Sequence, residues 1–154
     1  MRQLTVNQTV SGNSPRTQSF KEATGQTFDL GAPVVLNASG EVAEAATPAA
    51  SVVGVAAQPA NGAGASRYEP PAAGKPVSVW IANDDTLFAI QMAGAVQADL
   101  GKLVTVKKTG ALWAADRATA GTFLVMEIYT EIPGNNPIAV GKFLESATQM
   151  AKTA

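Results

Sequence analysis

The stretch Leu30–Val55 reads LGAPVVLNASGEVAEAATPAASVVGV, and it aligns without a gap to LGKLVTVKKTGALWAADRATAGTFLV at Leu100–Val125, a constant offset of 70 residues. Turn glycines and alternating apolar residues make up most of the seven identities in 26 positions: Leu30/Leu100, Gly31/Gly101, Val34/Val104, Gly40/Gly110, Ala45/Ala115, Ala50/Ala120 and Val55/Val125. Such residues determine the geometry of a β-hairpin. We therefore predict two pseudo-equivalent halves that close one β-rich domain. The alternative is that two unrelated hairpins share the same general pattern.

Strand patterns continue outside the two repeats. Lys75–Ala82 alternates apolar and polar side chains, and Thr86–Met92, Thr122–Thr130 and Ile138–Leu144 are further apolar runs. The 14 glycines and nine prolines indicate many turns. Nine or ten short strands leave almost no room for helix. The sequence thus predicts an all-β domain, a small barrel or a sandwich, over residues 28–144.

The two ends of the chain differ from this domain. Residues 1–27 are polar, and their large apolar side chains are Leu4, Val6, Val10 and Phe20. We interpret this segment either as an extended N-terminal arm that lies across a partner's surface or as a frayed terminus. Residues 145–154 form a C-terminal tail, either a short helix or a flexible end.

The composition excludes several functional classes. The net charge is −1 and charged residues make up 15% of the chain, which argues against capture of nucleic acid. Histidine and cysteine are absent, so the usual general base, thiolate nucleophile and commonest metal ligands are missing. We expect no catalytic, cofactor or metal site and no enzyme. We also expect no membrane span and no signal peptide, because no apolar run is long enough.

Three aromatic residues are candidates for contact with a partner or with another subunit. Trp80 lies in a predicted strand and Trp113 lies in the second repeat. We expect these two to be exposed, with packing in the core or in an interface as the alternative. Tyr68 is the one large side chain in the loop of residues 58–74, QPANGAGASRYEPPAAG, which is rich in alanine, glycine and proline. We interpret a loop of this length in a compact domain as either mobile or ordered by contact.

The run DLGAPVVLNASGEVAEAATPAASVVGVAAQPA at Asp29–Ala60 resembles the β-rich module of head-decoration, or capsid cement, proteins of tailed bacteriophages. The residues that carry the resemblance are Gly31, Val34, Leu36, Gly40, Val42, Ala45, Val53, Gly54, Val55 and Ala56. The resemblance implies a structural, non-enzymatic virion protein on the outer surface of the expanded capsid. It also implies the major capsid protein as partner and a homo-oligomer, commonly a trimer, with a dimer as the alternative.

On this interpretation, the N-terminal arm is ordered against capsid protein through Leu4, Val6, Val10 and Phe20. Two other classes remain open. A carbohydrate-binding surface module would use Trp80, Trp113 or Tyr68 to stack on a sugar. A structural protein of the tail or baseplate would have the same β-rich composition.

Overall fold

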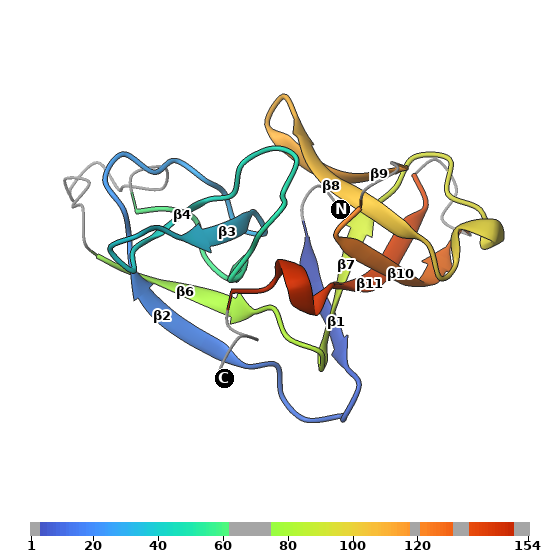
Figure 1. The fold of residues 1–154 in the computed structure, drawn as a ribbon, viewed down its shortest axis with the longest axis horizontal. Helices are drawn as coiled ribbons and strands as arrows, with labels where there is room; N and C mark the ends of the chain where they lie inside the picture. The colour runs from blue at the N-terminus through green and yellow to red at the C-terminus, as the bar shows by residue number, and fades with distance from the viewer. Residues whose placement is uncertain (1–3, 62–74, 118–120, 131–135, 150–154) are drawn as a thin grey trace.

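The computed structural model describes residues 4–61, 75–117, 121–130 and 136–149 of the 154-residue chain. These residues form two sheets, one of six strands in the order β1-β7-β11-β10-β8-β9 and one of five in the order β2-β6-β5-β3-β4 (Figure 1). The six-stranded sheet consists of β1 (Thr5–Thr9), β7 (Thr86–Gln91), β8 (Leu103–Thr109), β9 (Leu112–Arg117), β10 (Phe123–Tyr129) and β11 (Ile138–Phe143). The five-stranded sheet consists of β2 (Thr17–Lys21), β3 (Pro33–Leu36), β4 (Val42–Glu44), β5 (Gly54–Ala56) and β6 (Pro76–Ile81).

The predicted all-β class is confirmed, and of the two predicted architectures the structure is sandwich-like and not a closed barrel. Neighbouring strands in both sheets run antiparallel. The helical content of the described chain is small, as predicted: two single-turn 3-10 helices, η1 (Gln97–Asp99) and η2 (Glu145–Ala147).

The two halves predicted from the repeat are present in the strand order. The order β5-β3-β4 in one sheet corresponds to β10-β8-β9 in the other, and the next strand inward is β6 in one and β11 in the other. β3 and β8 begin 70 residues apart, β4 and β9 also begin 70 apart, and β5 and β10 begin 69 apart. The first repeat therefore forms the β4 edge of the five-stranded sheet, and the second repeat forms the β9 edge of the six-stranded sheet.

An Asp-Leu-Gly turn precedes the first strand of each half. In the first half, the N–H of Ala32 donates to the C=O of Asp29 at 3.2 Å. The N–H of Gly31 donates to the C=O of Ala56, and the N–H of Ala56 donates to the C=O of Ala32, both at 2.9 Å. Gly31 and Ala32 therefore both lie opposite the single residue Ala56, and Gly31 has a φ of +88°. This combination defines a G1 β-bulge.

The second half repeats this turn and bulge. The N–H of Lys102 donates to the C=O of Asp99 at 3.1 Å, and Gly101 and Lys102 both bond to Val125. Gly101 has a φ of +76°, and Leu100 before it has φ −58° and ψ 134°, the values of a type II turn. Because the aspartate is identical in both halves, the repeat extends one residue further than the alignment from Leu30 indicates.

The N-terminal segment is extended, as expected, but it is not an arm separate from the domain, and that prediction is corrected. β1 pairs with β7 and β2 pairs with β6, so residues 5–21 form one edge of each sheet. Leu4 is fully buried in the core, and Val6 and Phe20 pack against the core from half-buried positions. A polar segment fits this place because an edge strand needs only one apolar face.

Two chain connections link the sheets and are bonded to each other. Residues 10–16 lead from β1 to β2, and residues 82–85 lead from β6 to β7. The N–H of Val10 donates to the C=O of Asp85 at 2.8 Å, and the N–H of Ile81 donates to the C=O of Arg16 at 2.9 Å. The Asp85 carboxylate also accepts from the Ser11 N–H and the Ser11 hydroxyl, both at 2.7 Å.

A buried apolar cluster that spans both sheets forms the main core, separate from a small cluster at Leu87, Ala89 and Val140. Its largest fully buried side chains are Trp113, Phe28, Phe88, Phe123, Phe143 and Leu4. Phe143 meets Phe88 and Phe123 edge-on, with ring centroids 6.0 and 5.2 Å apart. The described part of the predicted tail also belongs to this domain, because the side-chain amide of Gln149 bonds to both backbone groups of Leu36 at 2.7 and 3.1 Å.

Candidate interaction surfaces

The structure separates the four apolar residues that were expected to contact the capsid. Leu4 is wholly buried, so it is not available to a partner, and its expected role as a contact residue is wrong. Val6 and Phe20 are half-buried against the core. Val10 alone is largely exposed, at 64%, where β1 ends. The four side chains therefore do not form a shared contact surface.

The three candidate aromatic residues also differ from expectation. Trp113 was expected to be exposed, but it is only 1% exposed and belongs to the core. Trp80 is half-buried on β6, opposite Thr17 of β2. Tyr68 lies outside the described residues. The aromatic side chains of residues 80 and 113 thus do not form a common stacking surface for a sugar.

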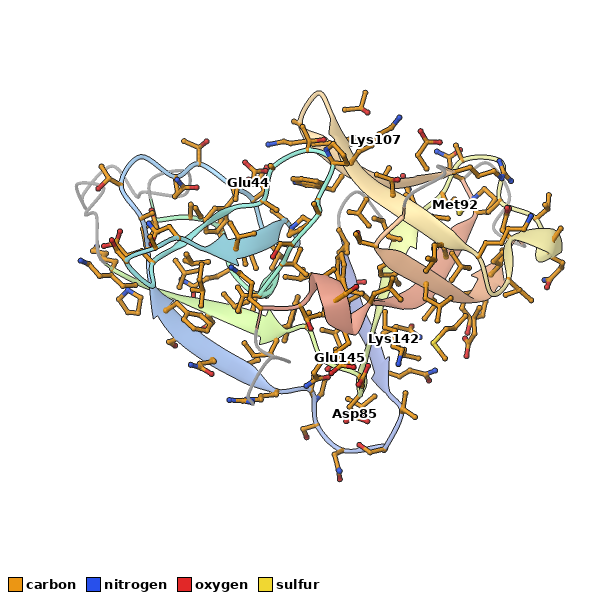
Figure 2. All side chains as sticks on the ribbon, in the orientation of Figure 1. Glu44, Asp85, Met92, Lys107, Lys142 and Glu145 are labelled. Atoms are coloured by element: carbon orange, nitrogen blue, oxygen red, sulfur yellow. The ribbon has the colours of Figure 1, made fainter. Side chains whose placement is uncertain are left out.

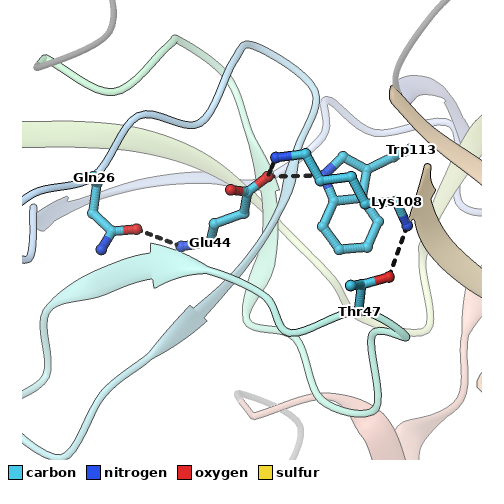
Figure 3. A network of polar contacts seen from close by, with 5 residues as sticks. All are labelled: Gln26, Glu44, Thr47, Lys108 and Trp113. Atoms are coloured by element: carbon cyan, nitrogen blue, oxygen red, sulfur yellow. Dashed lines mark hydrogen bonds and ion pairs between the residues drawn. The ribbon is translucent and has the colours of Figure 1, made fainter. Parts of the chain in front are cut away.

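The burial of Trp113 depends on the other half of the molecule. Glu44 on β4 reaches across to the β8–β9 hairpin, as Figure 3 shows. Its Oε1 accepts a hydrogen bond from Trp113 Nε1 at 3.0 Å and one from Lys108 Nζ at 2.7 Å. The indole N–H is therefore satisfied inside the protein, as a buried tryptophan requires.

Further bonds join the same two regions. The N–H of Lys108 donates to Thr47 Oγ1 at 2.9 Å, and the N–H of Ala49 donates to the C=O of Val106 at 2.8 Å. Thr122 Oγ1 donates to the C=O of Ala49 at 2.8 Å. Residues 47–49, which follow β4, thus connect the first half to the second through hydrogen bonds.

Among the described carboxylates, Asp99 at the end of η1 has a clearly lowered pKa. Arg117 donates to it twice, from Nε to Oδ1 at 2.9 Å and from Nη2 to Oδ2 at 2.6 Å, and the N–H of Val96 donates to Oδ2 at 2.9 Å. The hydrogen bonds from Arg117, followed by the Val96 N–H, lower the pKa of Asp99 from 3.8 to about 2. Arg117 also donates to the C=O of Gly94 at 2.6 Å. This pair holds the η1 turn in place against β9.

Most of the other charges in the described chain are also engaged internally. Carboxylates hold five of its cations, in the pairs Lys21–Glu41, Lys107–Asp116, Lys108–Glu44, Arg117–Asp99 and Lys142–Asp84. Among the described residues no group of three or more acidic, histidine or cysteine side chains could hold a metal ion. The expected turn at Asn83 is present, but it leads from one sheet to the other and is not a hairpin turn; Asn83 Oδ1 accepts from the N–H groups of Asp85 and Thr86 at 3.0 and 2.9 Å.

Large apolar side chains, by contrast, remain at the surface around β8 and β10. Leu103 pairs with Leu124 across the two strands, and Met126 follows on the same face of β10. Leu100 occupies the corner of the Asp-Leu-Gly turn, whose Gly101 bonds to Val125 of β10, and Val96 is the residue before η1. Val96, Leu100, Leu103 and Met126 are 52, 42, 41 and 43% exposed. We call these four residues together with Leu124 the β8–β10 apolar patch.

The sequence contained part of the signal for this patch. Leu30 and Leu100 are identical in the two repeats, and both are exposed, at 49 and 42%. A residue that precedes the positive-φ glycine of a type II turn points outward. The rest of the patch depends on which face of β8 is covered, and the alternation of strand residues alone does not show that.

No protein-family model matches the sequence, and no curated protein matches it. In the described part of the chain, no helix has the length and apolar character needed to cross a membrane.

Proposed function

We propose that this chain is a structural virion protein that binds the outer surface of a phage capsid and stabilises the expanded head by bridging capsid subunits. The resemblance at Asp29–Ala60 to head-decoration proteins is the first support. The second support is the distribution of chemistry in the domain. Five cations of the described chain are paired with its own carboxylates, whereas the large apolar side chains of the β8–β10 apolar patch stay at the surface, which suits a protein that works by contact.

The observation that carries the proposal is the β8–β10 apolar patch. A type II turn and a G1 bulge fix the position of Leu100, and a strand pair fixes that of Leu103. Side chains held in this way lose little freedom when they bind, so more of the contact energy contributes to affinity. Repetition of weak contacts over a capsid lattice then gives stable attachment.

The patch replaces the N-terminal segment as the proposed capsid contact. Deletion of residues 1–20 removes β1, most of β2 and the buried Leu4, so the truncated chain is expected to lose its fold. Such a truncation is therefore unsuitable as a test of binding, and point substitutions on the patch are needed.

The test is co-sedimentation with expanded, DNA-free heads made from the major capsid protein of the phage that encodes this chain. We expect saturable binding, and we expect Leu100→Ser with Leu103→Ser to weaken it about tenfold or more, as for residues at the centre of an interface. Leu112→Ser is the matched control, because Leu112 is equally exposed, at 44%, but lies outside the patch. Absence of binding by the unaltered chain, or equal loss with all these substitutions, would contradict the proposal.

A further inference from the structure

Most of the described cations are bonded within the chain, and Lys102 is an exception. Five lysine and arginine side chains form ion pairs with carboxylates of the chain. Arg16 donates to Gln18 Oε1 at 3.2 Å. Lys102 is exposed, and in the described part of the chain its ammonium group has neither a hydrogen-bond acceptor nor a carboxylate within ion-pair distance. The positive charge of Lys102 is therefore available to a partner.

Lys102 lies between two residues of the β8–β10 apolar patch. Its neighbours in the chain include Leu100 and Leu103, which are both exposed. The backbone of Lys102 is held on two sides, because its N–H donates to the C=O of Asp99 at 3.1 Å and its C=O accepts from the N–H of Val125 at 3.0 Å. The charge is thus attached to a fixed segment of the patch.

The acidic residue closest to Lys102 in the chain is already bonded to other groups. The side chain of Asp99 is only 3% exposed. Its two oxygens accept two hydrogen bonds from Arg117 and one from the N–H of Val96. Asp99 therefore does not form an ion pair with Lys102.

The carboxylate on β10 is also bonded elsewhere. Glu127 follows Met126 of the patch, and its Oε1 accepts from Gln8 Nε2 at 3.4 Å. Its Oε2 accepts from the Tyr129 hydroxyl at 2.7 Å. Of the described charged residues in β8, in β10 and in the turn before β8, Lys102 alone lacks a bonded partner.

The turn itself does not require a lysine at this position. The counterpart of Lys102 in the first half, 70 residues earlier, is Ala32, which is 1% exposed. Ala32 forms the same turn and bulge, and its N–H donates to the C=O of Asp29 at 3.2 Å. Because an alanine is sufficient for this backbone, the ammonium group of Lys102 is free to serve a contact outside the chain.

We propose that Lys102 forms an ion pair with an aspartate or glutamate of the capsid protein that covers the patch. The inference rests on the proposed function. When a partner covers Leu100 and Leu103, the ammonium group between them loses water, and a desolvated charge without a counter-charge is costly. A partner with a carboxylate at this point is therefore favoured over one without it. Lys102 thus selects the partner, whereas the apolar side chains supply the contact area.

A protein carboxylate fits this site better than the phosphate of a nucleic acid or a lipid. Binding to a phosphate backbone requires several lysine and arginine side chains, each of which neutralises one phosphate. Here a single unpaired ammonium group stands among apolar side chains, in a chain with a net charge of −1. Apolar surroundings with one charge match a protein interface.

The first test is co-sedimentation with expanded, DNA-free heads. Lys102→Met keeps an unbranched side chain and removes the charge, so we expect binding about tenfold weaker or more. Raising the salt concentration should weaken binding of the unaltered chain more than that of Lys102→Met. Lys107→Met is the matched control, because it changes the net charge equally and lies towards the hairpin end of the same strand, as Figure 2 shows. We expect Lys107→Met to bind as the unaltered chain does.

Chemical coupling with a carbodiimide measures the ion pair directly. The reagent activates a carboxylate, the Lys102 amine attacks it, and an amide bond forms while the reagent leaves as a urea. We expect mass spectrometry of the bound complex to show a Lys102 peptide joined to an aspartate or glutamate of the capsid protein. Lys107 already pairs with Asp116, so coupling of these two within the chain is the positive control.

The results distinguish this inference from the proposed function. Heads that do not bind the unaltered chain would overturn both. Binding that Lys102→Met leaves unchanged, or that Lys107→Met weakens equally, would overturn the ion pair and leave the capsid contact standing. Absence of coupling between Lys102 and capsid protein in a bound complex would overturn the ion pair in the same way. Both variants are expected to keep the unfolding temperature of the unaltered chain, which shows that a loss of binding is not a loss of fold.

Discussion

Arg117 forms a bidentate ion pair with Asp99, with Nε 2.9 Å from Oδ1 and Nη2 2.6 Å from Oδ2. The two residues lie on β9 and at the end of η1, so the pair ties the Asp-Leu-Gly turn of the second half to the edge strand of its sheet. Because the same turn presents Leu100, this pair also positions part of the β8–β10 apolar patch.

The Asp99–Arg117 pair is expected to make stability depend on pH in the acid range. The pKa of Asp99 in the folded chain is about 2, below its ordinary value of 3.8. A lowered pKa means that the folded state binds the proton less readily than the unfolded state does. The stabilisation is therefore complete above about pH 4 and is lost as the pH falls towards 2.

Urea unfolding over this pH range measures the effect. Asp99→Asn is expected to be less stable than the unaltered chain at neutral pH, and the difference should shrink towards pH 2. Asp84→Asn is the control, since Asp84 is 66% exposed in its pair with Lys142 and is expected to contribute little. A stability difference between Asp99→Asn and the unaltered chain that stays constant down to pH 2 would contradict the lowered pKa of Asp99.

Removal of the Glu44 carboxylate is expected to loosen the contact between the halves. Glu44→Gln replaces a charged acceptor of two hydrogen bonds, and we expect it to lower the free energy of unfolding by about 1 kcal/mol. A double-mutant cycle with Lys108→Met separates the ion pair from the bond to Trp113. Strictly additive effects would show that the ion pair adds nothing.

The two tryptophans are expected to differ in their access to solvent. Trp80→Phe leaves Trp113, which is 1% exposed, whereas Trp113→Phe leaves the half-buried Trp80. We expect acrylamide to quench the fluorescence of the second variant more strongly than that of the first. Equal quenching of two folded variants would show that Trp113 is not in the core.

Leu4 is expected to matter for stability and Val10 is not. Leu4→Ala empties a fully buried site and should lower the free energy of unfolding by about 2–5 kcal/mol. Val10→Ala changes a side chain that is 64% exposed, and a shift within about 0.5 kcal/mol is expected. Thermal or urea unfolding compares the two. Similar small effects for both would restore the N-terminal segment as an arm apart from the domain.

Local patterns were sufficient to predict the strands and the repeat. Alternating apolar residues and the glycines at positions 31 and 101 act over a few residues, and both glycines have the positive φ that their turn requires. The repeat is imperfect where packing differs. Val42 is buried, but its counterpart Leu112 is 44% exposed, because the buried residues of β9 are Trp113 and Ala115 and Leu112 lies on the other face of the strand.

Burial that depends on distant segments could not be predicted in the same way. Trp113 is covered because Glu44, 69 residues earlier, accepts its indole N–H. Leu4 enters the core because β1 finds β7, some 80 residues later. The partner of Arg117 is Asp99, 18 residues earlier, and not the adjacent Asp116, which pairs with Lys107. The sequence thus pointed to the apolar residues of the N-terminal segment, whereas Leu103 and Met126 are exposed on β8 and β10.

The paired connections at residues 10–16 and 82–85 have a mechanical consequence. A force that pulls the two sheets apart acts on these two connections, which run in opposite directions between the sheets. Hydrogen bonds from Val10 and Ser11 to Asp85 join the two connections. Neither connection can extend without sliding along the other, so the force is applied as shear to the hydrogen bonds between them. With this connectivity the domain resists stretching between its two sheets more than either connection alone would.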